Sequence, residues 1–170
     1  SAGLGVTNGL TPERLEQQRQ EMDALQKKLG DRIVILQGSE VEIHADGHLE
    51  FSNEVLAGLD IAIASLHMGL RQPREQVTER LINAIRNPHI DIIGHLSGRL
   101  LPNREGADLD MEAVLQAALE SGVCLEINAC PYRLDLDEVY ARRAAEMGIL
   151  LSINTDAHRP VELDLALYGY

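Results

Sequence analysis

The chain of 170 residues has no tryptophan, few aromatic residues, only two cysteines and little positive charge. Cys124 and Cys130 do not form a CxxC pair, which argues against a disulfide framework or a zinc knuckle. Lys and Arg number 15 against 27 Asp and Glu, which argues against a broad basic face for nucleic acid. No apolar run approaches the roughly 20 residues of a membrane span. We therefore expect a cytoplasmic protein with reduced thiols and no membrane partner.

Short apolar runs alternate with amphipathic stretches along the chain. The runs predict buried strands at residues 32–36, 60–65, 90–94, 123–128 and 149–154. Helices are predicted at residues 12–29, 73–86, 111–121 and 135–147. This alternation predicts βαβ crossovers and a parallel sheet, either open or closed. A length of 170 residues fits one such α/β domain.

Two local features add detail to this scheme. Leu15, Met22, Leu25 and Leu29 form one stripe, so the first helix is expected to cover another element with one face. The Asp46-Gly47 turn predicts a small hairpin over residues 41–51.

Candidate metal ligands follow four of the five predicted strands. They are Glu40, His67, His95 and the pair Asp156 and His158. The carboxyl ends of parallel strands share one edge, where α/β proteins assemble their sites. Imidazole and carboxylate suit zinc, manganese or iron, and such cations generate hydroxide and neutralise phosphoryl charge even in an acidic protein. Asp156 and His158, two residues apart in an extended segment, are expected to reach one cluster.

Each of these residues also has a structural interpretation. One histidine at a strand end is more often a hydrogen-bonded loop residue than a ligand, but four such positions together favour a metal site. Four arginines lie in the loops that follow the predicted strands: Arg99, Arg104, Arg133 and Arg159. Their guanidinium groups suit bidentate phosphate contacts, and Arg99 and Arg104 are the phosphate-binding candidates. Solvation, or pairing with the many acidic residues, is the alternative and is expected for at least two of the four. Glu126, on the fourth strand, either supports the metal ligands or is a paired core carboxylate, and the second interpretation is slightly favoured. No side chain is assigned as the nucleophile.

Five motifs of the chain resemble the PHP (polymerase and histidinol phosphatase) family. They are Gly38-Ser39-Glu40-Val41, Ala64-Ser65-Leu66-His67, Asp91-Ile92-Ile93-Gly94-His95, Leu125-Glu126-Ile127-Asn128 and Asn154-Thr155-Asp156-Ala157-His158. Residues 4–10 resemble, more narrowly, the PHP domain at the C-terminus of bacterial and archaeal X-family DNA polymerases. The resemblance implies a distorted (β/α)7 TIM-like barrel with up to three zinc or manganese ions. It makes Glu40 the bridging carboxylate and His67, His95, Asp156 and His158 terminal ligands.

The resemblance further implies hydrolysis of DNA phosphodiesters, as 3′→5′ exonuclease and 3′-end processing in DNA repair. Its implied partners are DNA 3′ ends and an upstream polymerase domain of the same parent chain. The His-x-His and Asp-His motifs that open the family pattern are absent, so residues 1–170 are expected to be one PHP domain whose N-terminal part is missing. The alternatives are a histidinol-phosphatase-like phosphomonoesterase and an inactive structural fragment. We expect the isolated fragment to be inactive and to self-associate through an exposed sheet edge.

Overall fold

A five-stranded parallel sheet forms the centre of the protein in the computed structural model, which describes residues 9–170. The strands are β1 (Gly38–Glu42), β2 (Ile61–Ser65), β3 (Ile92–Gly94), β4 (Cys124–Asn128) and β5 (Leu151–Asn154). They lie in chain order, and every neighbouring pair is parallel. The α/β class and the parallel sheet predicted from the sequence are confirmed. Most of the 4–10 motif lies outside the described residues.

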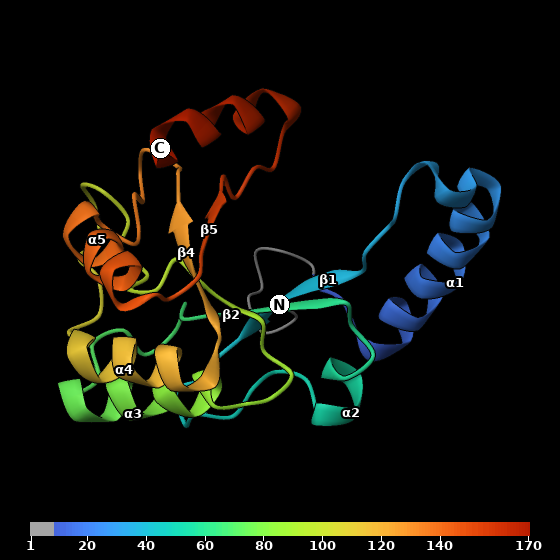
Figure 1. Cartoon of the computed structure of the whole chain (residues 1–170). Coiled ribbons are helices and arrows are strands. Elements are labelled where there is room, and N and C mark those ends of the chain that lie inside the picture. The colour runs from blue at the N-terminus through green and yellow to red at the C-terminus, as the bar shows by residue number, and fades with distance from the viewer. Residues whose placement is uncertain (1–8) are drawn as a thin grey trace.

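Helices connect the strands and cover the sheet. They are α1 (Pro12–Leu29), α2 (Asn53–Leu56), α3 (Arg74–Ile85), α4 (Met111–Ser121) and α5 (Glu138–Met147), with 3-10 segments η1 (Gly30–Arg32) and η2 (Pro160–Gly169). Helices α3, α4 and α5 gather on one side of the molecule, whereas α1 stands apart beyond β1 (Figure 1). Asp110 and Asp137 cap α4 and α5 by accepting hydrogen bonds from the amides of Ala113 and Tyr140.

The hydrophobic core lies between the sheet and α3, α4 and α5. Apolar strand residues with no exposed surface are Val41, Ala64, Ile93 and Leu125, one from each of four neighbouring strands. Helices α3 and α4 pack against each other and contribute Val77, Leu81, Val114 and Leu115, all fully buried. This packing holds the carboxyl ends of the first four strands in fixed positions.

The predicted strand at residues 32–36 is wrong, because the first strand begins only at Gly38. Ile33, Val34 and Leu36 are 56%, 72% and 55% exposed. The side-chain amide of Gln26 donates to the carbonyl of Ile33 and accepts from the amide of Ile35. The Gln26 side chain thus forms the hydrogen bonds that these two backbone groups would form with a neighbouring strand in a sheet.

The other two local expectations differ in outcome. Only Leu15 of the stripe on α1 is buried, and Leu25 is 47% exposed, so the helix is covered only near its beginning. The hairpin over residues 41–51 is confirmed by an antiparallel bridge between Ile43 and Leu49.

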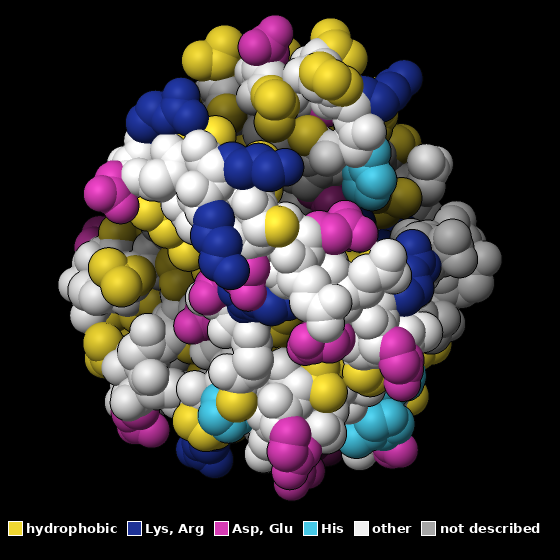
Figure 2. All heavy atoms as spheres, turned by 90° about the vertical axis from the view of Figure 1, so that its right-hand side faces the viewer, with side chains coloured by type: hydrophobic (Ala, Val, Ile, Leu, Met, Phe, Trp, Pro, Cys, Tyr) yellow, Lys and Arg dark blue, Asp and Glu magenta, His cyan; other side chains and the backbone are white. Residues whose placement is uncertain are grey.

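The surface carries both signs of charge. On the face in Figure 2, Lys and Arg side chains lie among Asp and Glu side chains, and no broad basic area forms there. Among the described residues, no helix combines the length and the hydropathy that crossing a bilayer requires.

Candidate metal centre

Glu40, His67 and His95 come together at the carboxyl edge of the sheet, and each can offer a ligand atom within 4.8 Å of the other two. Glu40 lies two residues before the end of β1, while His67 and His95 follow β2 and β3 closely. These three strands are neighbours, and the parallel register pairs Glu40 with Ile63 and Ser65 with Gly94. The sheet therefore brings together three of the five ligands that the sequence predicts.

The distances within this cluster fit a bound cation. Oε1 of Glu40 lies 3.1 Å from Nε2 of His95 and 3.5 Å from Nε2 of His67. Two ligands of one tetrahedral zinc ion, at about 2.0–2.1 Å from the metal, are about 3.3 Å apart. Both ring nitrogens of His95 are buried and have no well-aligned hydrogen-bond partner among the described residues. A histidine in this state is costly unless another group binds it, so the residues present fit a metal ion.

Glu42 orients His67 within the cluster. Its carboxylate is fully buried, and Oε2 lies 2.6 Å from Nδ1 of His67. Oε1 of Glu42 accepts hydrogen bonds from the backbone amides of His67 and Met68. A carboxylate on one ring nitrogen fixes the tautomer of a ligating histidine and leaves the other nitrogen for the metal.

Glu126 supports the segment that carries His95. Its Oε2 accepts hydrogen bonds from the backbone amide of His95 and from the side chain of Asn128, and Oε1 accepts from the side chain of Asn154. The residue is only 5% exposed. It is therefore a paired core carboxylate, and it also holds the His95 backbone in place.

The charges in the cluster favour an ionised Glu40. Burial alone would raise the pKa of Glu40, but His95, His67 and the Ser65 hydroxyl outweigh it and lower the pKa to about 2. Burial opposes the charged form of His95, yet the Glu40 carboxylate raises its pKa. Glu40 is therefore ionised at neutral pH and can offer an anionic ligand atom.

Asp156 and His158 do not join the cluster in this structure. Asp156 has a φ of +53°, so the predicted extended conformation of this segment is wrong. Its Oδ2 lies 3.3 Å from Nε of Arg133, and its carbonyl lies 2.8 Å from Nδ1 of His158. The left-handed backbone at Asp156 changes the direction of the chain, so the two side chains no longer share one side of an extended segment.

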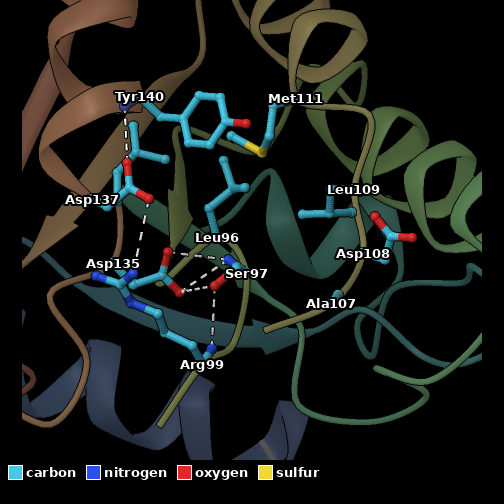
Figure 3. A pocket seen from close by; sticks show the side chains of 11 residues that line it. Leu96, Ser97, Arg99, Ala107, Asp108, Leu109, Met111, Asp135, Asp137 and Tyr140 are labelled. Atoms are coloured by element: carbon cyan, nitrogen blue, oxygen red, sulfur yellow. Dashed lines mark hydrogen bonds and ion pairs between the residues drawn. The ribbon is translucent and has the colours of Figure 1, made fainter. Parts of the chain in front are cut away.

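Arg99 makes structural contacts. Nε and Nη2 donate to the carbonyls of Arg133 and Leu134, and Nη1 lies 3.9 Å from Oδ2 of Asp137. Figure 3 shows Arg99 beside Ser97 and Asp135, whose carboxylate accepts hydrogen bonds from the amide and hydroxyl of Ser97. Arg99 therefore ties the loop after β3 to the loop after β4.

Two further loop arginines, Arg104 and Arg133, are less fully engaged. Nε of Arg104 donates to the Gly98 carbonyl. Nη1 of Arg133 is buried and has no hydrogen-bond partner within the described part of the chain. Arg133 thus keeps a buried, unused donor, as Arg80 does at its Nε.

Sequence reasoning missed Glu42, and it named Arg133 only as one of four loop arginines. A signal for Glu42 existed, because residues two apart on a strand share one face, and Glu42 follows Glu40 at that spacing. No sequence signal separates Arg133 from the neighbouring loop arginines.

The fold and the cluster define a parallel α/β protein with one carboxylate and two imidazoles at the carboxyl edge of its sheet, a donor set that suits a hydrolytic metal site. No family model matches the chain. The chain is 44% identical over 161 residues to the DNA polymerase/3'-5' exonuclease PolX of Bacillus subtilis (strain 168), a match that covers 95% of this chain and 28% of that protein.

Two probable phosphatases are also similar. One, from Thermoanaerobacter sp. (strain X514), is 38% identical over 136 residues, which is 74% of this chain and 53% of the phosphatase. Another, from Shewanella oneidensis, is 32% identical over 140 residues, which is 77% of this chain and 53% of that protein. The chain thus spans 28% to 53% of the length of these three relatives. The matches confirm the resemblance to the PHP family and to X-family DNA polymerases.

Proposed function

We propose that the chain is the metal-dependent phosphoesterase part of an X-family DNA polymerase, and that the intact protein hydrolyses DNA phosphodiesters at 3′ ends. The convergence of Glu40, His67 and His95 carries this proposal. The Bacillus subtilis relative is named a DNA polymerase/3'-5' exonuclease, which supports DNA 3′ ends as the substrate.

The residues of the cluster have distinct roles in this proposal. Glu40 supplies an anionic ligand, and His67, oriented by Glu42, supplies a neutral one. His95 supplies a second imidazole from a backbone that Glu126 holds. When bound, zinc or manganese activates water at neutral pH and offsets the charge that develops on the phosphoryl group.

The complete site is larger than this cluster. Asp156 and His158 join the ligand set, with up to three ions in the complete domain, once Asp156 exchanges the Arg133 side chain for a cation. Residues 1–170 form one incomplete PHP domain, and further strands beside β1 complete a (β/α)7 barrel. In the described residues β1 has a sheet neighbour on only one side, which leaves room for such strands.

The loop arginines Arg104 and Arg99 are the candidates for phosphate binding. Arg104 uses only Nε in a hydrogen bond within the described residues, so its two Nη groups can reach a phosphate. Arg99 is the weaker of the two candidates predicted from the sequence, because Nε and Nη2 already donate to carbonyls.

The test is the degradation of DNA with a recessed 3′ end by the intact polymerase. We expect Mn²⁺-dependent release of nucleotides that Glu40→Ala abolishes. Glu75→Ala, on the exposed face of α3, is the matched control and should retain the wild-type rate. Equal degradation by the Glu40→Ala and wild-type proteins would overturn the proposal.

The probable phosphatases among the relatives favour a second candidate, a phosphomonoesterase that acts on a small metabolite. Parallel assays with histidinol phosphate and with a DNA 3′ end decide between the two. Faster hydrolysis of histidinol phosphate would favour the second candidate.

A third candidate is that the isolated chain serves only structure or association. It predicts that the 170-residue chain lacks the activity of the intact protein in a side-by-side assay. The edges at β1 and β5 further predict self-association, which size-exclusion chromatography measures. A stable monomer at all concentrations would contradict that part.

A further inference from the structure

A cavity of about 370 Å³ opens among the segments that follow β3, β4 and β5. Its apolar walls include Leu100, Leu101, Tyr132 and Leu165. The Asn103 amide and the Arg133 guanidinium add polar groups. A volume of this size with mostly apolar walls and a few polar groups is typical of pockets that hold small organic molecules.

The charged groups around the cavity leave one donor unused. Asp156 lies against Nε of Arg133, and the Glu162 carboxylate accepts hydrogen bonds from the Arg159 side chain and the His158 amide. Nη1 of Arg133 is buried without a hydrogen-bond partner in the part of the chain that the structure describes. An anionic oxygen would satisfy this donor, since a guanidinium binds phosphate oxygens well.

The cavity also lies close to the metal centre. Cys130, which lines the cavity, donates its backbone amide to Oδ1 of Asn128. The Asn128 side chain donates to the same Glu126 carboxylate oxygen that accepts from the backbone amide of His95. A ligand whose phosphate reaches Arg133 therefore has its ester bond near the cluster, while the rest of the ligand extends over the apolar walls.

We propose that this cavity binds the terminal nucleoside of a DNA 3′ end, with the adjoining phosphate at Arg133. A nucleobase has two apolar faces that suit Tyr132 and the leucines, and a polar edge that suits the Asn103 amide. Base stacking on an aromatic side chain is strong and tolerates every base, as an exonuclease requires. This inference rests on the proposed function, and it identifies the cavity as the place where the protein binds the end of the substrate.

The test compares the binding of thymidine 5′-monophosphate and inorganic phosphate to the full 170-residue chain in the presence of Mn²⁺. Isothermal titration should show tighter binding of the nucleotide than of phosphate. Tyr132→Ala should weaken nucleotide binding about five- to 150-fold and leave phosphate binding unchanged. Tyr168→Ala is the matched control, because Tyr168 is 62% exposed against 65% for Tyr132 and does not line this cavity.

Three results would overturn the inference: equal affinity for nucleotide and phosphate, equal loss in both tyrosine variants, and no binding of either ligand. These outcomes are separate from the fate of the proposed function. Preferential nucleotide binding without DNA hydrolysis by the intact polymerase would contradict the proposed function and support the nucleoside pocket. DNA hydrolysis that depends on Glu40, together with equal binding of nucleotide and phosphate, would support the proposed function and contradict the nucleoside pocket.

Discussion

Nδ1 of His67 lies 2.6 Å from Oε2 of Glu42, a carboxylate with no exposed surface. Because this contact fixes the ring, Glu42→Gln should weaken Zn²⁺ binding by about 10- to 100-fold. Competition with a chromogenic chelator measures the affinity. Glu75→Gln on exposed α3 should bind Zn²⁺ as the wild type does. Wild-type affinity in a folded Glu42→Gln protein would show that Glu42 does not position His67.

Arg99→Ala should destabilise the fold, because the carbonyls of Arg133 and Leu134 lose their hydrogen-bond donor. The expected loss in the free energy of unfolding is about 1–3 kcal/mol. Urea denaturation gives the value. Arg74→Ala, which removes only the long exposed ion pairs to Asp108 and Asp110, should change stability by less than about 0.5 kcal/mol. Equal stability of both variants would refute a structural role for Arg99.

Gly94→Ala should disturb the approach of β3 to β2. A Cβ at Gly94 would lie 2.6 Å from Oγ of Ser65 and 3.0 Å from Cγ2 of Ile63. Overpacking of this kind costs about 1–3 kcal/mol and displaces the backbone before His95. The double variant Gly94→Ala with Ser65→Ala should recover part of the loss in thermal unfolding. No recovery would mean that the Ser65 contact is not the cause.

Asp135→Asn should change how stability depends on pH. Burial is the main cause that raises the pKa of Asp135, although Ser97 opposes it. The folded protein then holds this proton at pH values where the unfolded chain has released it. Wild-type stability is therefore full below the unfolded pKa and falls as pH rises through the raised folded pKa. The asparagine variant lacks this loss, so its stability relative to wild type should increase from pH 4 to pH 7 in urea denaturation. A constant difference would contradict the raised pKa.

The sequence was sufficient for most of the sheet and for the centre of the site. The runs around Ala64, Ile93 and Leu125 are buried in the middle of a parallel sheet, where apolar β-branched residues mark strands well. His67 and His95 follow from strand order, because parallel strands place their carboxyl ends at one edge. Glu40 reaches the same edge although its strand was predicted at residues 32–36, because β1 begins at Gly38 and contains Glu40.

Other features depend on contacts that no run of residues encodes. Ile33 and Val34 have the composition of a strand, yet Gln26 binds the neighbouring backbone and the two side chains stay exposed. Asp156 has the spacing of a ligand, but its left-handed backbone and Arg133 direct it elsewhere. Propensity and spacing therefore indicate the conformations and contacts that are open to a residue, whereas its tertiary contacts determine which of them it adopts.

The most direct test of the central claim is Zn²⁺ binding to the 170-residue chain, measured by chelator competition and by metal analysis of the dialysed protein. We predict at least one bound ion, which is lost in both Glu40→Ala and His95→Ala and kept in Glu75→Ala. A folded wild-type chain that binds no Zn²⁺, or a Glu40→Ala chain that binds it as tightly, would contradict the claim that Glu40, His67 and His95 form a metal centre.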